Sequence, residues 1–406
     1  MKVLQINAVY GIGSTGRIVA EIDEVLVQSG IESIVATTQT TVRKDNIYIV
    51  GTSVGRKVHA LLSRLIGKQA YFSAFATKRL LNWIKKEKPD VIHLGNLHAN
   101  YVHLGMLLKY VKKYNIATVI TLHDCWFFTG KCTHYTEQGC YKWQTGCHHC
   151  PQLKKGNRSW FFDCTSTIWQ DKKRWITEIP RLGVIGVSDW ITEEAKKSFL
   201  KDATIIKRIY NWIDLQIFYP RGDDVKGKYG IPTDKFSILC IGAHWAKDSF
   251  KFNQLIELSK RIREDMQIVL VGNVPAESQL PANVKALGYI SSTDELAKLY
   301  SSMDVYVHLS REDTFGKVIA EAMACGTPAI VYNATACPEL IGKGCGYVVE
   351  VGDIAAVCNA LEKIQNDKKE AYSVACVEFV QAAFEKRMLI EETKLMYKDL
   401  LEGEKK

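Results

Sequence analysis

Long apolar runs are missing from this sequence, as are low-complexity tracts and obvious short repeats. A membrane-spanning helix needs roughly 18 or more consecutive apolar residues, and no uncharged run approaches that length. The N-terminus, MKVLQINAVY, carries neither a long apolar core nor a small-residue cleavage site, so it does not read as a secretory signal. We therefore expect a cytoplasmic protein that does not cross a membrane.

Little in the overall composition is unusual. Hydrophobic residues make up 47% of the chain and charged residues 24%, which is ordinary for a globular protein. A chain of 406 residues is too long for one ordinary core, so two domains are expected. The 12 cysteines are expected to be reduced thiols or metal ligands, because disulfides are rare in a cytoplasm.

The net charge of +9 is distributed unevenly. Between Arg56 and Lys88 the basic residues far outnumber the single acid, Glu87, and they alternate with leucines and aromatic residues. This pattern predicts basic amphipathic helices that lie on an anionic bilayer surface, such as the inner face of the plasma membrane. The alternative is a solvated helix pair packed on a sheet. We expect no nucleic-acid partner, because no recognised nucleic-acid motif accompanies the charge.

A glycine motif follows the first expected strand. Gly11, Gly13 and Gly16 form G-x-G-x-x-G between the strand KVLQINA and a helical run, which is the context of a dinucleotide fingerprint. A nicotinamide site also needs an acid at the end of the next strand, and IESIVATTQT ends without one. We interpret the loop as a turn that faces a phosphate; a tight turn without a ligand is the alternative.

The strand and helix pattern occurs twice along the chain. Continuous apolar strands alternate with amphipathic segments, which is typical of a parallel sheet covered on both faces. A turn-rich, charged stretch near 218–231 separates the two series. We expect an α/β protein with two doubly wound domains facing across a cleft, and ligands at the carboxyl ends of the strands. The expected boundaries are 1–217, 218–380 and a C-terminal helix, 381–406, that packs back toward the first domain.

The most specific stretch is SREDTFGKVIAEAMACGTPAIVY, residues 310–332. Asp313 and Glu321 stand eight positions apart, and Phe315-Gly316 opens a helix between them. Backbone N–H groups at the start of that helix can bind a diphosphate. Glu321, two turns further on, can accept hydrogen bonds from ribose hydroxyls, and Asp313 is placed for hydroxyls of a sugar.

This signature resembles that of glycosyltransferase family 4, the retaining enzymes of the GT-B fold found in bacterial surface-polysaccharide synthesis. The resemblance extends over nearly the whole chain. It implies transfer of a hexose-type sugar from a UDP- or GDP-sugar to a saccharide or lipid-linked saccharide acceptor, with no cofactor or metal essential for catalysis. Further matching stretches are the glycine loop, TLHD at 121–124, GVS at 186–188, NWIDLQIFYP at 211–220 and LVGN at 270–273.

The resemblance also implies residue roles. Glu321 would bind the donor ribose, Asp313 would contact the transferred sugar, and His123 would lie near that sugar as a second catalytic residue. The implied donor-binding residues are Gly13, Gly16, Lys247, Lys251, Phe315, Gly316, Lys317, Val318 and Glu321.

Two positions depart from the family pattern. Asp313 is one methylene shorter than the usual Glu. Gly242-Ala243 stands where the family usually has a glycine followed by Arg, and the usual Lys-Gly is missing. Lys247 and Lys251 are both candidates for the cation that faces the diphosphate. Two alternatives stay open: a GT-B epimerase or phosphorylase, against which the signature argues, and a zinc- or nucleic-acid-binding module.

The segment CTHYTEQGCYKWQTGCHHC suggests a metal site. Cys132, Cys140, Cys147 and Cys150 are separated by seven, six and two residues, so the segment has one C-x-x-C and not the two of a strong zinc ribbon. His134, His148 and His149 are spare ligands. We expect a structural zinc ion here; the alternative is buried free thiols.

Overall fold

The structure is a computed structural model that describes residues 1–275 and 279–403. The chain divides into two compact units. Unit 1 comprises Met1–Tyr210 and the C-terminal segment from Ile390, and unit 2 comprises Asn211–Leu389. The expected boundary at residue 217 therefore lies seven residues beyond the end of the first stretch of unit 1. Among the described residues, no helix is both long and apolar enough to cross a bilayer.

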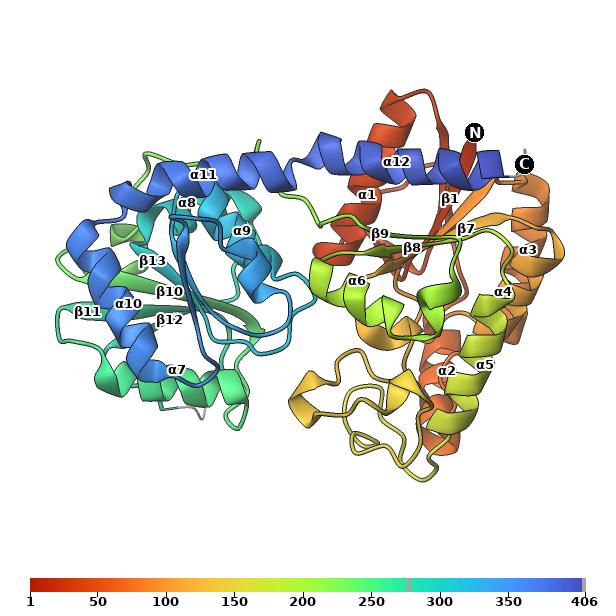
Figure 1. Ribbon diagram of the computed structural model, residues 1–406, viewed down its shortest axis with the longest axis horizontal. Coiled ribbons are helices and arrows are strands. Elements are labelled where there is room, and N and C mark those ends of the chain that lie inside the picture. Colours follow the sequence, from red (N-terminus) through yellow and green to blue (C-terminus); the bar gives the residue numbers. More distant parts are fainter. Residues whose placement is uncertain (276–278, 404–406) are drawn as a thin grey trace. The chain divides into compact units, whose positions relative to one another are not determined.

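Unit 1 is built on a seven-stranded parallel sheet in the order β5-β3-β1-β6-β7-β8-β9 (Figure 1). The inner strands are buried along almost their whole length, because helices cover both faces and apolar side chains can point either way. A two-stranded sheet, β2 with β4, lies beside the glycine motif. The strands are β1 (Lys2–Ile6), β2 (Val9–Tyr10), β3 (Glu32–Thr37), β4 (Gln39–Thr40), β5 (Ile47–Ile49), β6 (Val91–Leu94), β7 (Ala117–Leu122), β8 (Leu182–Gly186) and β9 (Ile205–Arg208).

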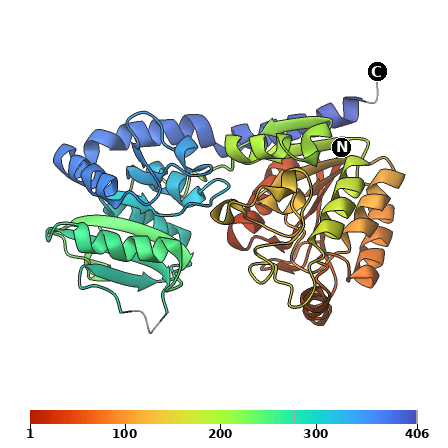
Figure 2. The same ribbon diagram turned by 60° about the horizontal axis from the view of Figure 1, so that its bottom comes forward.

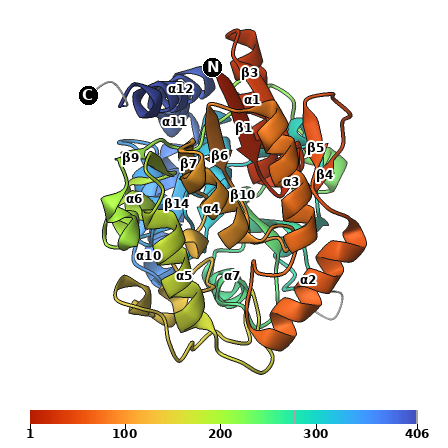
Figure 3. The same cartoon turned by 90° about the vertical axis from the view of Figure 1, so that its right-hand side faces the viewer.

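Helices form a layer on each face of the unit 1 sheet. Gln5, His93 and Gly183 belong to one row across the strands, so they point to the same face. Gln5 donates to a carbonyl of α1, His93 bonds the Tyr397 hydroxyl of α12 at 2.6 Å, and Leu400 of α12 lies against Gly183. Helices α3, α4 and α5 lie side by side on the other face (Figure 3). The helices are α1 (Gly13–Gln28), α2 (Ser53–Ile66), α3 (Ala74–Glu87), α4 (Leu104–Lys113), α5 (Thr165–Thr177), α6 (Asp189–Lys196) and α12 (Lys386–Glu402).

The connection from β7 to α5 differs from every other connection in unit 1. Residues 123–164 contain no strand and no α-helix, only three short 3₁₀ turns, and Figure 1 shows them as irregular yellow chain. These turns are η1 (Cys125–Phe127), η2 (Thr136–Gln138) and η3 (Lys142–Gln144). We call residues 123–164 the cysteine segment, because it contains six of the cysteines.

Unit 2 repeats the architecture with a six-stranded parallel sheet in the order β12-β11-β10-β13-β14-β15. Figure 2 shows α7, in green, along this sheet. Helices α7 and α10 contact each other on one face, and α8, α9 and α11 form the layer on the other. The elements are β10 (Phe236–His244), α7 (Phe250–Arg261), β11 (Met266–Asn273), β12 (Val284–Gly288), α8 (Thr293–Ser302), β13 (Val305–His308), α9 (Lys317–Ala324), β14 (Ala329–Tyr332), β15 (Gly346–Val349), α10 (Ile354–Asp367) and α11 (Glu370–Phe384).

Strand order places the ligand sites of both units. In each sheet the first strand lies in the interior, and the chain proceeds outward in one direction before crossing to the other side. The switch points lie between β1 and β6 in unit 1 and between β10 and β13 in unit 2. Ligands of doubly wound sheets bind at the carboxyl ends of the strands beside such points. The expected two doubly wound α/β domains are confirmed.

Candidate active site

The signature helix α9 begins at Lys317, directly after Gly316. Gly316 has a φ of +85°, and a Cβ there would stand 2.8 Å from the Ile319 side chain. A residue with a side chain is therefore strained at this position. Phe315 is buried and packs edge-on against Phe384 at 5.4 Å between ring centroids, which fixes the start of the helix. The open N–H groups of the first turn, at Lys317 and Val318, thus have a defined direction.

Glu321 lies within α9 and is only 7% exposed. The Tyr300 hydroxyl of α8 donates to its carboxylate at 3.4 Å. Burial, together with the negative charge of Glu321, raises the pKa of Tyr300 well above its usual value, so Tyr300 stays a hydrogen-bond donor. A carboxylate in such surroundings has a fixed position and few water contacts, which suits it to accept hydrogen bonds from a ligand.

Asp313 is held by a chain of hydrogen bonds at the end of β13. The His308 Nε2 atom lies 2.8 Å from the Asp313 carboxylate, and the Tyr306 hydroxyl lies 2.9 Å from His308 Nδ1. A carboxylate can only accept, so Nε2 carries the proton and Nδ1 accepts from Tyr306. The backbone N–H of Asp313 donates to the Thr335 hydroxyl at 3.0 Å. The carboxylate is therefore oriented before any ligand arrives.

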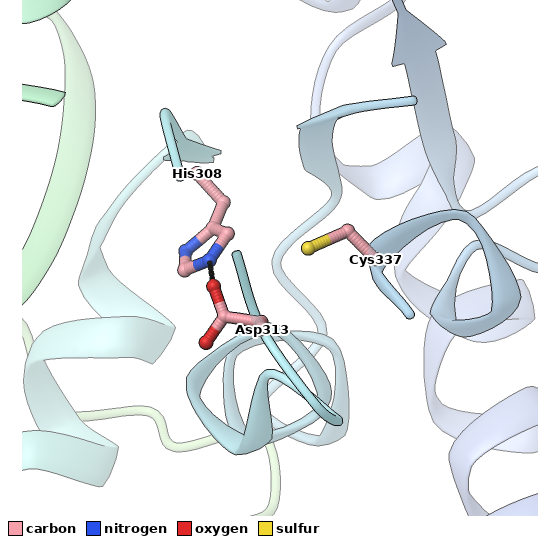
Figure 4. Close-up of side chains that lie close together, drawn as sticks. All are labelled: His308, Asp313 and Cys337. Atoms are coloured by element: carbon pink, nitrogen blue, oxygen red, sulfur yellow. Dashed lines mark hydrogen bonds and ion pairs between the residues drawn. The ribbon is translucent and has the colours of Figure 1, made fainter. Parts of the chain in front are cut away.

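The Cys337 thiol faces this histidine–aspartate pair (Figure 4). Within the described residues, His308, Asp313 and Cys337 are the one group of three potential metal ligands whose atoms lie within 4.8 Å of one another. The His308–Asp313 hydrogen bond already accounts for the orientation of the carboxylate. We therefore interpret these three residues as a site that orients the Asp313 carboxylate, and we assign no metal to them.

The structure distinguishes the two candidate lysines. Lys247 is exposed in the loop between β10 and α7. Lys251 lies in the first turn of α7, and its ammonium packs on Gly242, where a Cβ would stand only 2.8 Å from Nζ. Burial lowers the pKa of Lys251, and the charge of Asp313 opposes that shift, so the two groups interact. Lys251 thus brings a cation to the strand end where the family resemblance expects an arginine.

In unit 1 the glycine motif surrounds the start of α1. Gly11 and Gly13 have φ values of +71° and +64°, and the Gly11 N–H donates to the Gly16 carbonyl at 2.8 Å. A Cβ on Gly16 would touch Val9 at 3.0 Å, so Gly16 lets the helix approach β2 closely. Gly13 is exposed and a Cβ there meets nothing within 4 Å. The backbone N–H groups at this helix start are open to a ligand.

His123 follows the end of β7, and the adjacent Asp124 is paired with a histidine that the sequence analysis missed. His98, in the segment after β6, lies with Nε2 2.8 Å from the Asp124 carboxylate. The other carboxylate oxygen accepts a hydrogen bond from the backbone N–H of Trp126 at 2.8 Å. Burial favours a raised pKa for Asp124, but His98 and the Trp126 N–H outweigh it, so the pKa lies below its ordinary value.

Comparison with known proteins identifies the family. Residues 15–217, half of the chain, match the family described as Glycosyltransferase Family 4, and residues 235–367 match Glycosyl transferases group 1. The chain belongs to glycosyltransferase family 4. It has the GT-B fold of that family, and the two parallel-sheet α/β units are its two domains.

Individual relatives agree with this assignment. The N-acetyl-alpha-D-glucosaminyl L-malate synthase of Bacillus anthracis is 28% identical over 49% of this chain and 55% of its own length. This chain therefore matches about half of that relative. The putative colanic acid biosynthesis glycosyl transferase WcaC of Escherichia coli is 25% identical over 77% of both chains. The structure of Anabaena Alr3699/HepE in complex with UDP-glucose has a TM-score of 0.63 and 17% identity, over 97% of this chain and 99% of that one.

The glycosyltransferase carries its expected site residues in two groups. Unit 1 holds Gly13 and Gly16 at the start of α1, after β2, and His123 directly after β7. Unit 2 places Asp313 where its charge acts on Lys251, and it places Glu321 on the helix that follows Asp313. Sequence reasoning missed His98 and His308, which follow or end expected strands; that position was the available signal.

The His98–Asp124 pair predicts a pH dependence of stability. The pKa of Asp124 is lower in the folded than in the unfolded chain, so its contribution is present above the ordinary value of 3.8 and is lost as pH falls below it. We expect Asp124→Asn to lower the free energy of unfolding by about 1–3 kcal/mol at neutral pH. The difference from the wild type should shrink below about pH 4.

Urea denaturation followed by tryptophan fluorescence, at neutral and acidic pH, measures this difference. Asp202→Asn, at an exposed aspartate of the same unit, is the control and should have little effect at either pH. A difference for Asp124→Asn that stays constant or grows as pH falls would contradict the assignment.

Proposed function

We propose that this glycosyltransferase moves a hexose-type sugar from a UDP- or GDP-sugar to a saccharide or lipid-linked saccharide, with retention of anomeric configuration, in surface-polysaccharide synthesis. The observation that carries the proposal is the arrangement of α9, with an oriented Asp313 carboxylate before its N-terminus and the buried Glu321 about one turn into the helix. The names of the relatives, among them a colanic acid glycosyl transferase, support the biosynthetic context.

The proposed donor subsite is defined by the direction of helix α9 and by the charges of the side chains around its start. The first turn of α9 presents N–H groups and the positive end of the helix dipole to a diphosphate. Lys251 adds a cation at the neighbouring strand end, and Glu321 accepts hydrogen bonds from the ribose hydroxyls. Asp313 contacts hydroxyls of the transferred sugar. The Anabaena HepE structure, which shares the fold, was solved with UDP-glucose, and this supports a nucleotide-sugar donor.

Retention is proposed from the positions of the carboxylates. Asp313 and Glu321 are both engaged at the signature helix, Asp313 by His308 and Glu321 by Tyr300. We assign neither as a nucleophile behind the anomeric carbon. The acceptor hydroxyl then attacks on the face from which the diphosphate leaves, and the departing phosphate takes its proton. Lys251 and the helix dipole stabilise the charge that develops on the leaving group.

The acceptor is proposed to be membrane-borne because of the exposure of α2. This helix buries only His59 and Ser63. Its apolar stripe points outward: Val54 is 68%, Val58 51% and Leu61 46% exposed. We call this stripe, together with the exposed aromatic residues beside it, the outer patch; the aromatic members are Phe75, Trp160, Phe161 and Phe162. Amphipathic helices with an outward apolar stripe and basic flanks bind anionic bilayer surfaces.

A pocket adjoins the outer patch. It has a volume of about 600 Å³ and lies between α2 and the start of α3. Val58, Leu62 and Phe72 form its apolar wall, and Arg56 and Arg79 stand at its lining. This combination suits a lipid carrier, whose chain needs apolar contacts and whose phosphate needs cations. We propose that the lipid-linked acceptor approaches unit 1 here.

The first test measures donor binding and stereochemistry. A thermal-shift screen against UDP- and GDP-sugars should raise the melting temperature with one nucleotide class, because a ligand that binds only the folded state stabilises it. With that donor, the anomeric proton signal of the product should show the configuration of the donor. An inverted product contradicts the retaining assignment, and transfer that requires free phosphate would indicate a phosphorylase instead.

The second test concerns the signature carboxylates. We expect Glu321→Gln to lower kcat/KM by about ten- to hundredfold, because hydrogen bonds to a charged group contribute roughly 1.5–3 kcal/mol. Asp313→Asn and His123→Ala should lower kcat more than donor affinity, since both residues are assigned to the sugar. Glu362→Gln, at an exposed position of α10, is the matched control and should stay active. A fully active Glu321→Gln enzyme would show that the wrong carboxylate has been assigned.

The third test concerns the membrane. The protein should float with liposomes that contain anionic lipid and less with neutral ones, because each Lys or Arg near an anionic surface contributes about 1 kcal/mol. Replacing Val54 and Val58 with Glu should abolish flotation. Val374→Glu, at a valine of unit 2 that is 66% exposed, should not change it. Absence of binding to both kinds of liposome would contradict the membrane proposal. It would not affect the proposal for the donor site.

A further inference from the structure

The cysteine segment needs a source of stability that its secondary structure does not supply. Between His123 and Cys164 the backbone forms only three short 3₁₀ turns, and long irregular loops are uncommon inside compact domains. Yet Phe128, Tyr135 and Trp143 of this segment are almost completely buried, so it is folded and packed. Small irregular folds of this kind are commonly held by a metal or by disulfides.

Four of the cysteines converge on one cavity. Cys132, Cys140, Cys147 and Cys150 all line a cavity of about 20 Å³, which has room for one water-sized sphere. The Cys132 and Cys150 side chains are within hydrogen-bonding reach of each other. Cys147 interacts with both Cys140 and Cys150. Cysteines far apart in the segment therefore line one small cavity.

Backbone N–H groups are directed at two of these sulfurs. The Gly130 N–H donates to Cys147 Sγ at 3.2 Å, and the N–H of Gln152 donates to Cys150. A Cβ on Gly130 would stand 2.8 Å from the Thr165 carbonyl and 3.0 Å from Cys147, so only glycine fits there. N–H donors favour the thiolate over the thiol, and the thiolate is the form that binds metal.

Two buried lysines lie near these sulfurs: Lys131 lines the cavity, and Lys172 bonds the carbonyl of Thr129, which also lines it. Lys131 donates to the carbonyls of Gln152, Leu153 and Lys155, and Lys172 donates to those of Trp126 and Thr129. Neither lysine forms an ion pair with a carboxylate within 4 Å among the described residues.

A buried ammonium group needs an anion nearby. Cys132 interacts electrostatically with both Lys131 and Lys172, Cys150 with Lys131 and Cys147 with Lys172, while Asp124 and Asp163 act on the lysines from beyond ion-pair distance.

We propose that Cys132, Cys140, Cys147 and Cys150 bind one structural zinc ion that holds the cysteine segment together. Four thiolates and Zn²⁺ carry two net negative charges, which the neighbouring Lys131 and Lys172 would offset when protonated. A tetrahedral site with Zn–S bonds of about 2.3 Å places the sulfurs about 3.8 Å apart. No three sulfurs of the segment meet even a 4.8 Å spacing within the described residues, so binding draws the cysteine side chains inward. This site is independent of the transfer reaction.

The histidines of the segment are not assigned as ligands. His148 lines the cavity, whereas His134 and His149 do not. Four cysteines already complete a tetrahedral structural site, and such sites are closed to substrate and water. His148 is therefore placed beside the site and not in it.

Metal analysis of tagless wild-type protein is the first measurement. We expect close to one zinc per chain, and after exchange the cobalt form should show the charge-transfer and visible bands of tetrahedral thiolate coordination. Chelator treatment should expose four additional thiols to a thiol reagent. Protein without metal, or a Cys132–Cys150 disulfide found by mass spectrometry, would overturn the proposal.

Variants locate the ligands. Cys147→Ser and Cys150→Ser should each lose most of the zinc and make the cysteine segment sensitive to protease. Cys164→Ser, at a cysteine of the same segment that does not line the cavity, is the matched control and should keep one zinc. If a variant does not fold, the wild-type metal content and cobalt spectrum decide the question. A zinc content that is unchanged in both ligand variants would contradict the assignment.

Discussion

A parallel sheet that is covered by helices on both faces leaves only its strand ends for polar chemistry, and this constraint places the working residues of both units. The inner strands of unit 1 and unit 2 are almost entirely buried. His123 and Asp124 follow β7, His308 ends β13, and Asp313 lies in the loop that β13 feeds. Because all strands of a unit point the same way, these side chains gather at one edge of each sheet.

At that edge, unit 1 and unit 2 each orient a carboxylate with a histidine. Each pairs an aspartate with a histidine at 2.8 Å, His98 with Asp124 and His308 with Asp313. The two pairs differ in their additional hydrogen-bond partners. Tyr306 fixes the tautomer of His308, whereas the backbone N–H of Trp126 donates to the Asp124 carboxylate. In both, side-chain orientation is fixed by the protein and does not depend on a ligand, which is the condition for electrostatic preorganisation.

The sequence predicted the two α/β domains, their strands and the signature helix, because apolar periodicity and glycine punctuation are local signals. It also named Asp313 and Glu321, since their eight-residue separation around the start of one helix is a local property. It did not reveal His98 or His308 as partners, because a side-chain pair between neighbouring strands or loops depends on strand order. Nor did it distinguish Lys247 from Lys251; our preference for Lys251 rests on its ammonium packing near Gly242, a contact between α7 and β10.

Burial was equally hidden from the sequence. Glu321 reads as an acid on the surface of a helix, yet it is almost enclosed and bonded to Tyr300. The apolar stripe of α2 points outward, whereas the sequence pattern left open both a bilayer-facing helix and a helix packed on a sheet. In both cases the residue types suit the opposite environment, and the mismatch costs free energy in the isolated chain. Proteins retain such mismatches where a ligand or a surface removes the cost.

The same reasoning applies to the cysteine segment, and it links that segment to the strand ends. Lys172 of α5 is buried against the Trp126 ring, with Nζ 3.5 Å from the ring centroid, and donates to the Trp126 carbonyl. The backbone N–H of Trp126 in turn donates to Asp124, which pairs with His98. The ammonium group is thus one end of a continuous polar chain that reaches the edge of the sheet. Burial lowers the pKa of Lys172 to about 7, and Cys147, Asp124 and Cys132 oppose that shift, so the charge of Lys172 depends on the cysteine segment and on the strand edge together.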